Sequence, residues 1–393
     1  MINLNQNQAY STQPLLRLGF RPFFFASGVI AVVSMLLWVV FYQFSVSVNN
    51  VSSSQWHAHE MIYAYAAAVA VGFLLTASKN WTGIQTLYGK PLLALLLVWI
   101  AGRFLAFIPS QYLAYQAVID SGFLFLSSVA ITYTIIKGKN WSNFPIVAKL
   151  ILLAAAHITY YLGVLGWLEK GIDIGIYAGF YLIISLLFMM ARKLLPFFIE
   201  RGLNLNIELK NSKFLDLSSL FLFLIFIITE VFFQTIISNI LAAALFIIHA
   251  LKMFNWYHVK IWQKPLLWSI YLAYGLLTLG FALNAISSVV TLMPNMDIHS
   301  FAFGIALMTL SMMARVSLGH TGRNVFQPPK QVNLMFILLT LAFVVRVVLV
   351  AIFPEYYANL IFISQLLWIL SFSGFVIIYT PMFFQARLDG QFG

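Results

Sequence analysis

The sequence has no cysteine and few charged residues. The first absence excludes several kinds of metal site, and the second argues against a soluble domain. Without cysteine there is no disulfide, no thiolate ligand for haem and no cysteine-bound iron–sulfur cluster. Any metal must therefore be held by His, Met, Tyr, carboxylate or backbone oxygen. Charged residues make up 8% of the chain, against roughly 25% in a soluble domain. Because 62% of the 393 residues are hydrophobic, we predict an all-α, polytopic membrane bundle.

Several motifs of soluble enzymes are also missing. The sequence contains no Gly-rich phosphate loop, no Gly-x-Ser-x-Gly elbow and no His-Glu-x-x-His zinc helix. Hydrolysis and nucleotide-driven activity therefore have no support. There is no convincing internal repeat or soluble domain either. We expect one integral membrane domain over 1–393, in which the longest loop, 192–213, could separate six-helix halves at 1–200 and 201–393.

Apolar runs divide the chain into about twelve segments of spanning length, because roughly 20 apolar residues cross the hydrocarbon core of a bilayer. The expected spans are 22–44, 57–78, 91–108, 111–136, 145–168, 174–198, 214–234, 236–260, 265–292, 298–319, 331–353 and 358–384.

The 22 Lys and Arg residues predict the orientation of these spans, because basic residues are retained on the cytoplasmic side. When successive spans alternate in direction, every Lys and Arg residue except Arg103, Lys170 and Arg346 falls on or near one side of the membrane. Both termini are then cytoplasmic. Nucleic acid is not an expected partner, since binding it needs clustered basic residues, whereas weak attraction to anionic lipid is expected.

The seven His residues are the main source of metal-ligand chemistry. Imidazole is costly inside lipid unless it has a partner, and transition metals and haem are its common strong partners. The predicted spans sort the residues by depth into an outer layer of His57, His59 and His299, a middle layer of His157 and His249, and an inner layer of His258 and His320.

The outer layer centres on the segment from Trp56 to Met61. His57, Glu60 and Met61 share a helical face at i, i+3 and i+4, which suits a copper-type site. His57 and His59 point to nearly opposite faces of a regular helix, so both reach one ion only if the first turn is irregular. Alternatively, the His and Glu side chains cap the helix, and Glu60 complements its dipole. The metal hypothesis takes as ligands His57, His59, His299 and Met61, with Glu60 as the catalytic proton carrier.

The middle layer suggests a cofactor. His157 and His249 each lie roughly 18 Å from the inner end of their predicted helix at about 1.5 Å per residue, so their depths match. Two imidazoles at one depth on different helices can clamp a haem iron from both faces. The alternative is two separate buried imidazoles, each bonded to a backbone carbonyl or to a polar neighbour such as Thr159 or Asn255.

Charged residues inside the predicted spans are few. Arg103 and Asp120 fall in the outer half of a tight helical hairpin, where facing each other would neutralise two costly charges. A proton-carrying or haem-propionate role is the alternative for this pair. Arg346 is a candidate for binding an anionic cofactor group, unless its side chain simply extends to the outer interface.

Several motifs resemble the NnrS family, in order along the chain. They are Arg21 to Phe24, Trp56 to Met61, Gly72 to Ala77, Asn80 to Gly83, Ala101 to Arg103, Thr309 to Arg323 and Ala386 to Gly390. One position departs from the pattern: after Pro265 to Trp268 the family usually has His near the position of Tyr271. A cofactor role at that position is not expected here.

The resemblance implies a twelve-span inner-membrane protein of bacteria that contains haem, expected as haem b, and copper. It also implies a role in the response to nitric oxide and nitrosative stress. It favours metal binding by the outer His layer and haem binding by the middle one. His320 could also bind haem, with Arg315 and Arg323 on the propionates. The alternative is a cationic cytoplasmic turn with Gly319 and Gly322 ending the helix.

Two classes of function remain open, and the sequence does not decide whether the protein is an enzyme. In the first, a His-ligated metal centre handles nitric oxide, or a nitrosylated small molecule, by nitrosyl or redox chemistry. In the second, the chain is a membrane transporter or a delivery protein for haem or copper, and the His layers form a relay. Because transporters usually contain repeats, we prefer the first. The oligomeric state is not indicated.

Overall fold

The computed structural model describes residues 12–393 except 45, 47, 49, 50, 205–208, 210, 234, 291 and 292. Within these residues the chain is helical. It has no strand there, and one isolated β-bridge joins Val48 and Val51. The all-α fold class predicted from composition is therefore confirmed.

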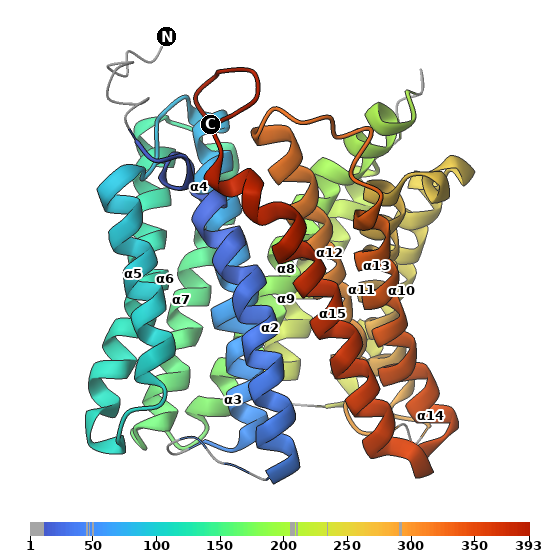
Figure 1. Cartoon of the computed structure of the whole chain (residues 1–393). Coiled ribbons are helices and arrows are strands. Elements are labelled where there is room, and N and C mark those ends of the chain that lie inside the picture. The colour runs from blue at the N-terminus through green and yellow to red at the C-terminus, as the bar shows by residue number, and fades with distance from the viewer. Residues whose placement is uncertain are drawn as a thin grey trace. The chain divides into compact units, whose positions relative to one another are not determined.

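Long helices alternate with short 3-10 or π-helical turns, labelled η, and Figure 1 shows their course. The α-helices are α2 (Phe20–Phe44), α3 (Ser53–His59), α4 (Ala67–Thr82), α5 (Gly89–Leu105), α6 (Leu113–Lys137), α7 (Phe144–Val164), α8 (Gly171–Leu203), α9 (Lys213–Phe232), α10 (Ile236–Trp256), α11 (Pro265–Ile286), α12 (Met296–His320), α13 (Gln331–Phe343), α14 (Val350–Ile352) and α15 (Tyr357–Phe384). The π-helical turns are η2 (Glu60–Ala66) and η6 (Val344–Leu349), and the 3-10 turns are η1 (Pro14–Leu16), η3 (Ser110–Tyr112), η4 (Trp141–Asn143), η5 (Val259–Gln263) and η7 (Pro354–Tyr356).

In the described residues, 11 helical segments are long and apolar enough to cross a membrane. The chain is therefore a multi-pass membrane protein. α5, at the predicted span 91–108, has 17 residues, and a twelfth crossing at this helix stays a prediction. α8 continues through Pro196 to Leu203, so residues 192–203, which we expected in a loop, are helical.

Two compact units make up the chain. Unit 1 comprises Met1–Ile183, Val316–Asn324 and Phe375–Gly393, and unit 2 comprises Ile184–Arg315 and Val325–Gly374. The helices α8, α12 and α15 contribute residues to both units. Whether the predicted halves 1–200 and 201–393 behave as separate domains stays a prediction.

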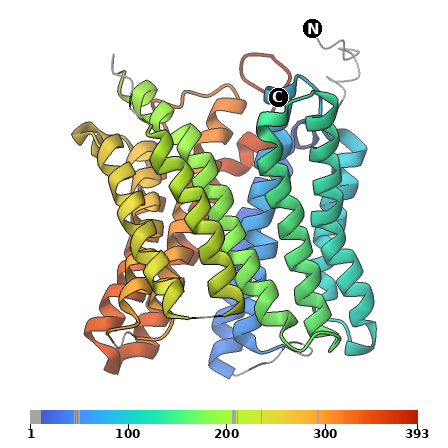
Figure 2. The same cartoon turned by 180° about the vertical axis from the view of Figure 1, so that it is seen from behind.

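Unit 1 is organised around α6, which packs against α4, α5 and α7, while α2 packs against α4 and η2. These helices lie side by side in both views (Figures 1 and 2). The segment that starts with α3 begins at a capping box. The Ser52 hydroxyl accepts the Gln55 N–H, and the Gln55 side chain accepts the Ser52 N–H. Such reciprocal bonds satisfy helix N–H groups that lack a partner within the helix.

A buried arginine joins the start of α2 to the end of α15 within unit 1. Arg21, 0% exposed, donates from Nη1 to the carbonyl oxygens of Met382, Phe383 and Gln385 at 3.0, 2.8 and 2.9 Å. Its Nη2 donates to the carbonyl oxygen of Gly393 at 2.8 Å. Three of these carbonyls lie where α15 ends, and the carbonyls of the last helical turn have no partner within the helix. The guanidinium supplies the missing donors.

We expect Arg21→Ala to lower the free energy of unfolding by on the order of 3 kcal/mol, because several buried carbonyls lose a charged donor together. The apparent midpoint of thermal unfolding of the detergent-solubilised protein measures the effect. Lys90→Ala, which removes an exposed cation from the same unit, is the control. Equal midpoints for the two variants would show that this contact contributes nothing.

Candidate metal centre

Three buried side chains from α3, α6 and α7 converge in unit 1. The Nε2 atoms of His59 and His157 are 2.9 Å apart. The Oδ2 atom of Asp120 lies 3.5 Å from the first and 3.6 Å from the second. The residues are 3%, 1% and 2% exposed, in that order. Among the described residues this is the one group of three His, Asp or Glu side chains that can hold a metal ion.

The separations of these three atoms suit a first-row transition metal. Zinc- and copper-type ions bind imidazole nitrogen and carboxylate oxygen at about 2.0 to 2.2 Å. An ion about 2.0 Å from all three atoms would see them at mutual angles of roughly 95 to 130°, within the range of tetrahedral and trigonal coordination. The three donor atoms already lie at separations that such an ion can bridge.

A carboxylate fixes which nitrogen of His59 faces the cluster. Glu60 Oε1 lies 3.0 Å from His59 Nδ1, so in the neutral ring Nδ1 carries the proton and Nε2 presents a lone pair to His157. If His157 Nε2 carries a proton, the two rings share a hydrogen bond. If it carries a lone pair, two lone pairs face each other at 2.9 Å, and a cation between them relieves the repulsion. A carboxylate on the distal N–H is the usual environment of a metal-binding His.

The three candidate ligands lie at one depth. His59 is six residues from Ser53 at the start of α3, Asp120 is seven from Leu113 at the start of α6, and His157 is seven from Val164 at the end of α7. At about 1.5 Å per residue, each lies roughly 10 Å from the same end of its helical segment. Because α7 runs antiparallel to α6, counting from opposite termini gives the same level.

Tyrosine rings cover both imidazoles. Tyr63 stacks on His157 with ring centroids 4.1 Å apart and an interplanar angle of 12°, and Tyr160 stacks on His59 at 4.6 Å and 27°. The Tyr63 hydroxyl donates to the carbonyl oxygen of Gly175 at 2.5 Å, which fixes its ring. Tyr63 belongs to η2, a π-helical turn, and such turns often occur at functional sites.

Arg103 on α5 balances the acidic groups of the cluster. Its Nη2 donates to Asp120 Oδ1, and its Nη1 lies 3.6 Å from Glu60 Oε2. The predicted ion pair between Arg103 and Asp120 is therefore confirmed. Tyr161 donates its hydroxyl proton to Asp120 Oδ2 at 2.6 Å. With neutral imidazoles, two carboxylates against one guanidinium leave one negative charge, which a bound cation offsets.

The other predicted ligands of the outer layer have different surroundings. His57 stacks on Trp38 of α2 at 4.5 Å and 14°, so the structure brings His59 to His157 and not to His57. His299 belongs to unit 2, where its Nδ1 lies 2.7 Å from the carbonyl oxygen of Asn295. Met61 is half-buried beside Glu60 in η2. The cap of α3 comes from Ser52 and Gln55, as described above, and not from His57 or Glu60.

His249 is enclosed by side chains of unit 2. Its Nδ1 lies 2.5 Å from the Tyr274 hydroxyl and its Nε2 lies 3.2 Å from the Ser219 hydroxyl. Phe188 stacks on its ring at 3.9 Å, and Phe281 is parallel at 5.7 Å. Both nitrogens therefore contact hydroxyl groups, and Phe188 covers one face of the ring. This matches the alternative of a buried imidazole bonded to hydroxyl groups, although with Ser219 and Tyr274 as partners.

The other residues predicted to bind a cofactor have individual partners. The Arg315 guanidinium lies 3.9 Å over the Phe198 ring in unit 2. In unit 1, Arg323 Nη2 donates to the Gln385 side chain at 3.1 Å, and His320 packs 5.5 Å from the Phe20 ring. Arg346, in η6, lies 5.7 Å over the Tyr357 ring. A cofactor role for these residues stays a prediction.

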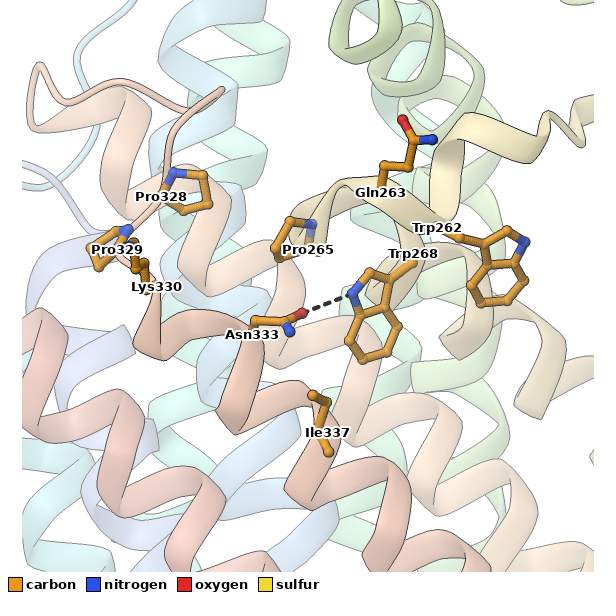
Figure 3. A pocket seen from close by; sticks show the side chains of 9 residues that line it. All are labelled: Trp262, Gln263, Pro265, Trp268, Pro328, Pro329, Lys330, Asn333 and Ile337. Atoms are coloured by element: carbon orange, nitrogen blue, oxygen red, sulfur yellow. Dashed lines mark hydrogen bonds between the residues drawn. The ribbon is translucent and has the colours of Figure 1, made fainter.

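A hollow of about 560 Å³ lies in unit 2 where α11 and α13 begin (Figure 3). The Trp268 indole N–H donates to the Asn333 side-chain oxygen at 3.0 Å across one wall. Its lining contains neither His nor carboxylate, so it offers no metal site. On the same helix, Tyr271 donates its hydroxyl proton to the carbonyl oxygen of Met253 at 2.9 Å.

The family model of the NnrS protein matches residues 14–387, which include His59, Asp120 and His157, referred to below as the His59 cluster. The chain belongs to the NnrS family. The resemblance seen in the motifs is thereby confirmed. A comparison with curated proteins finds no match.

Close approach of α5 to α6 at Gly102 holds Asp120 in the cluster. A Cβ atom at Gly102 would lie 2.6 Å from Asp120 Oδ1, whereas one at Gly122 on α6 would meet nothing within 4 Å. We expect Gly102→Ala to destabilise the protein by about 1–3 kcal/mol through overpacking. Gly122→Ala should be neutral or stabilising by up to about 1 kcal/mol. Thermal unfolding of both variants in detergent tests this, and an unaffected Gly102→Ala would contradict the close approach.

Proposed function

We propose that this NnrS-family protein binds copper through His59, His157 and Asp120 and handles nitric oxide, or a nitrosylated small molecule, at that centre. The observation that carries the proposal is the convergence of two imidazole nitrogens and one carboxylate oxygen within 3.6 Å of each other in a buried site. Membership of the NnrS family supports the connection with nitric oxide. The bacterial cytoplasmic membrane is the proposed location.

Copper is one of the metals that imidazole ligands suit, together with zinc, iron and nickel. We choose copper because the family is expected to contain it. When bound, it supplies a one-electron couple and a Lewis-acid position for a small ligand. The protein itself positions the ligands. Glu60 fixes the tautomer of His59, the stacked tyrosines fix the orientation of both imidazole rings, and Arg103 fixes the position of Asp120. The assignment of Glu60 as a catalytic proton carrier stays a prediction.

Haem between His157 and His249 does not fit these contacts. The Nε2 of His157 faces His59, and both nitrogens of His249 face hydroxyl groups. Three cavities formed by described residues, of about 560, 410 and 490 Å³, have no His in their linings. Haem b is therefore retained as an expectation from the family, and we assign no step to it.

Orientation in the membrane is proposed from charge. With twelve spans and both termini cytoplasmic, as the distribution of Lys and Arg predicts, the end of unit 1 at which α3 begins faces away from the cytoplasm. The His59 cluster would then lie about 10 Å below that surface. Nitric oxide, being small and uncharged, can reach this depth through lipid.

A transport or delivery function would need a relay of ligands. Among the described residues of unit 1, His57 packs on Trp38 and His320 packs near Phe20, while His59 and His157 meet at one place. These contacts describe a single site. We therefore do not propose transport.

Metal content tests the ligand set. We expect the purified full-length protein to hold one copper ion per chain. His59→Ala, His157→Ala and Asp120→Asn should each lower the copper occupancy at least tenfold, because loss of one ligand of three removes much of the binding free energy. Inductively coupled plasma mass spectrometry of protein expressed with added copper gives the stoichiometry.

His57→Ala and His258→Ala are matched controls, since each removes an imidazole outside the cluster. Both should keep the occupancy of the unmodified protein. Protein that is folded and free of metal after copper-replete expression would show that His59 and His157 share only a proton, and the proposed centre would be wrong.

Nitric oxide binding tests the activity. We expect the absorption or paramagnetic resonance spectrum of the reduced protein to change when nitric oxide is added, and this change to vanish in His59→Ala and His157→Ala but persist in His57→Ala. A haem Soret band lost only in two other His variants would instead identify haem ligands elsewhere. Saturable copper or haem uptake into vesicles, with no nitric oxide response, would favour transport.

A further inference from the structure

Basic side chains from four separate segments of unit 1 converge at the end where α2 begins and α4 ends. We call them the cationic cluster: Arg17, Arg21, Lys79, Arg323 and Arg387. Two of them lie over the same ring, because the Arg17 Cζ atom is 6.0 Å and the Lys79 Nζ atom 4.9 Å from the centroid of Phe392. Retention of basic residues on one side of a membrane explains their number, but it does not explain why they gather in one place.

Shared partners connect the other members of the cluster. Arg21 donates to the Gln385 carbonyl oxygen at 2.9 Å, and Arg323 donates to the Gln385 side-chain oxygen at 3.1 Å. Arg387 donates to the carbonyl oxygen of His320 at 3.3 Å, three residues before Arg323. The charges of the other three arginines all repel the charge of Arg21. These positive charges therefore act on one another.

Carboxylates are scarce at this end of the unit. The acidic residues in the sequence of unit 1 are Glu60, Asp120, Glu169, Asp173 and Asp389. The first two belong to the metal centre, and the next two lie where α7 ends and α8 begins, at the opposite end. Asp389 pairs with Arg387 at 2.5 Å. Among the described residues, Arg21, Lys79 and Arg323 make no ion pair, so the cluster has an excess of positive charge.

This excess favours a bound anion. Charges of one sign that are held together destabilise the compact state through their repulsion. An anion that binds between them offsets this repulsion and stabilises the folded protein, because it does not bind the unfolded chain in the same way. Lys79, Arg323 and Arg387 are each partly exposed, so an anion can reach them from outside.

Exposed apolar side chains beside the cluster indicate which anion fits. Phe384 is 48% and Leu388 68% exposed, and they flank Gln385 and Arg387 in the chain. Phe384 also makes an edge-to-face contact with Phe25 of α2 at 5.4 Å. The ends of spanning helices lie at the level of lipid headgroups, where phosphate and acyl chain are close together. A phospholipid offers a partner to both kinds of side chain, whereas a soluble phosphate offers only charge.

We propose that the cationic cluster is a specific site for an anionic phospholipid, such as phosphatidylglycerol, in the leaflet that this end of unit 1 faces. Lys79 and Arg323, which lack ion pairs, balance the charge of the phosphate, and Phe384 contacts an acyl chain. A zwitterionic lipid fits less well, because its ammonium group would add to the positive charge already present. The proposal does not depend on the metal centre.

Thermal unfolding of the full-length protein in dodecyl maltoside, a neutral detergent, tests the site. We expect added dioleoylphosphatidylglycerol to raise the midpoint by about 2–5 °C. Dioleoylphosphatidylcholine, which carries no net charge, should have little effect. The phosphatidylglycerol concentration that gives half of the effect should rise roughly fivefold in Lys79→Gln, because one cation at the lipid phosphate is lost.

Lys90→Gln is the matched control, since it removes an exposed cation from the start of α5, at the same end of unit 1 but outside the cluster. It should respond to phosphatidylglycerol as the unmodified protein does. If Lys90→Gln weakens the response as much as Lys79→Gln, the lipid is held by general surface charge and the specific site is wrong. An equal response to the two lipids would also overturn it.

Soluble glycerol 3-phosphate separates the two sources of phosphate. It should not reproduce the shift at the concentrations at which phosphatidylglycerol acts, because it lacks acyl chains. If it does, the cluster binds a soluble phosphate and the lipid assignment is wrong.

The unfolding midpoint without lipid distinguishes binding from a structural role. Lys79→Gln should raise this midpoint, because it removes repulsion. A lower midpoint would show that the charge of Lys79 is already compensated, which contradicts the proposal. If Lys79→Gln does not fold, Arg323→Gln removes the other cation without an ion pair and is judged by the same results.

Copper content is measured on the same preparations. A specific lipid response in protein that holds no copper would refute the proposed copper centre and leave the lipid site standing. Copper binding without a specific lipid response would refute only the lipid site.

Discussion

The interaction on which the rest of unit 1 depends is the placement of Arg103 between Asp120 and Glu60. A charged side chain costs roughly 3 kcal/mol to place at the centre of a membrane helix, so neither carboxylate would be retained there alone. The guanidinium contacts both carboxylates, and they in turn face the nitrogens of His59 and His157. Arg103, Asp120 and Glu60 therefore depend on one another, because removing one of these charged groups leaves the others uncompensated.

Much of the helical fold could be predicted from the sequence, because apolar runs of spanning length are a strong signal. The pairing of Arg103 with Asp120 was also predictable, since both lie near one tight turn. The choice of partner for His157 was not. Counting depth along the predicted spans matched it with His249 and put His59 nearer the surface, because the span 57–78 began four residues after Ser53 and the span 145–168 ended four residues after Val164. Depth alone leaves rotation about the helix axis open, and that rotation decides which side chains meet.

Two buried histidines show how one residue type takes different roles in one membrane protein. His249 has a hydroxyl at each nitrogen and Phe188 stacked on its ring, so both of its nitrogens have hydrogen-bond partners. His157 has one nitrogen directed at His59 and the other without a hydrogen-bond partner among the described residues. A sequence pattern cannot distinguish these cases, because the decisive partners come from helices far apart in the chain. The buried imidazole that lacks a hydrogen-bond partner at one nitrogen is the candidate for a functional role.

The contacts of Arg21 bear on how the protein is made. Its guanidinium near the start of α2 is bonded to carbonyls at Met382, Phe383 and Gln385. A nascent chain is inserted from its N-terminus, so this side chain enters the membrane long before its acceptors are synthesised. Unit 1 therefore cannot reach its final structure during translation of its own first helices. Its assembly must wait until residues 382–393 have been synthesised, and truncation before them should trap the earliest helices in an incompletely assembled state.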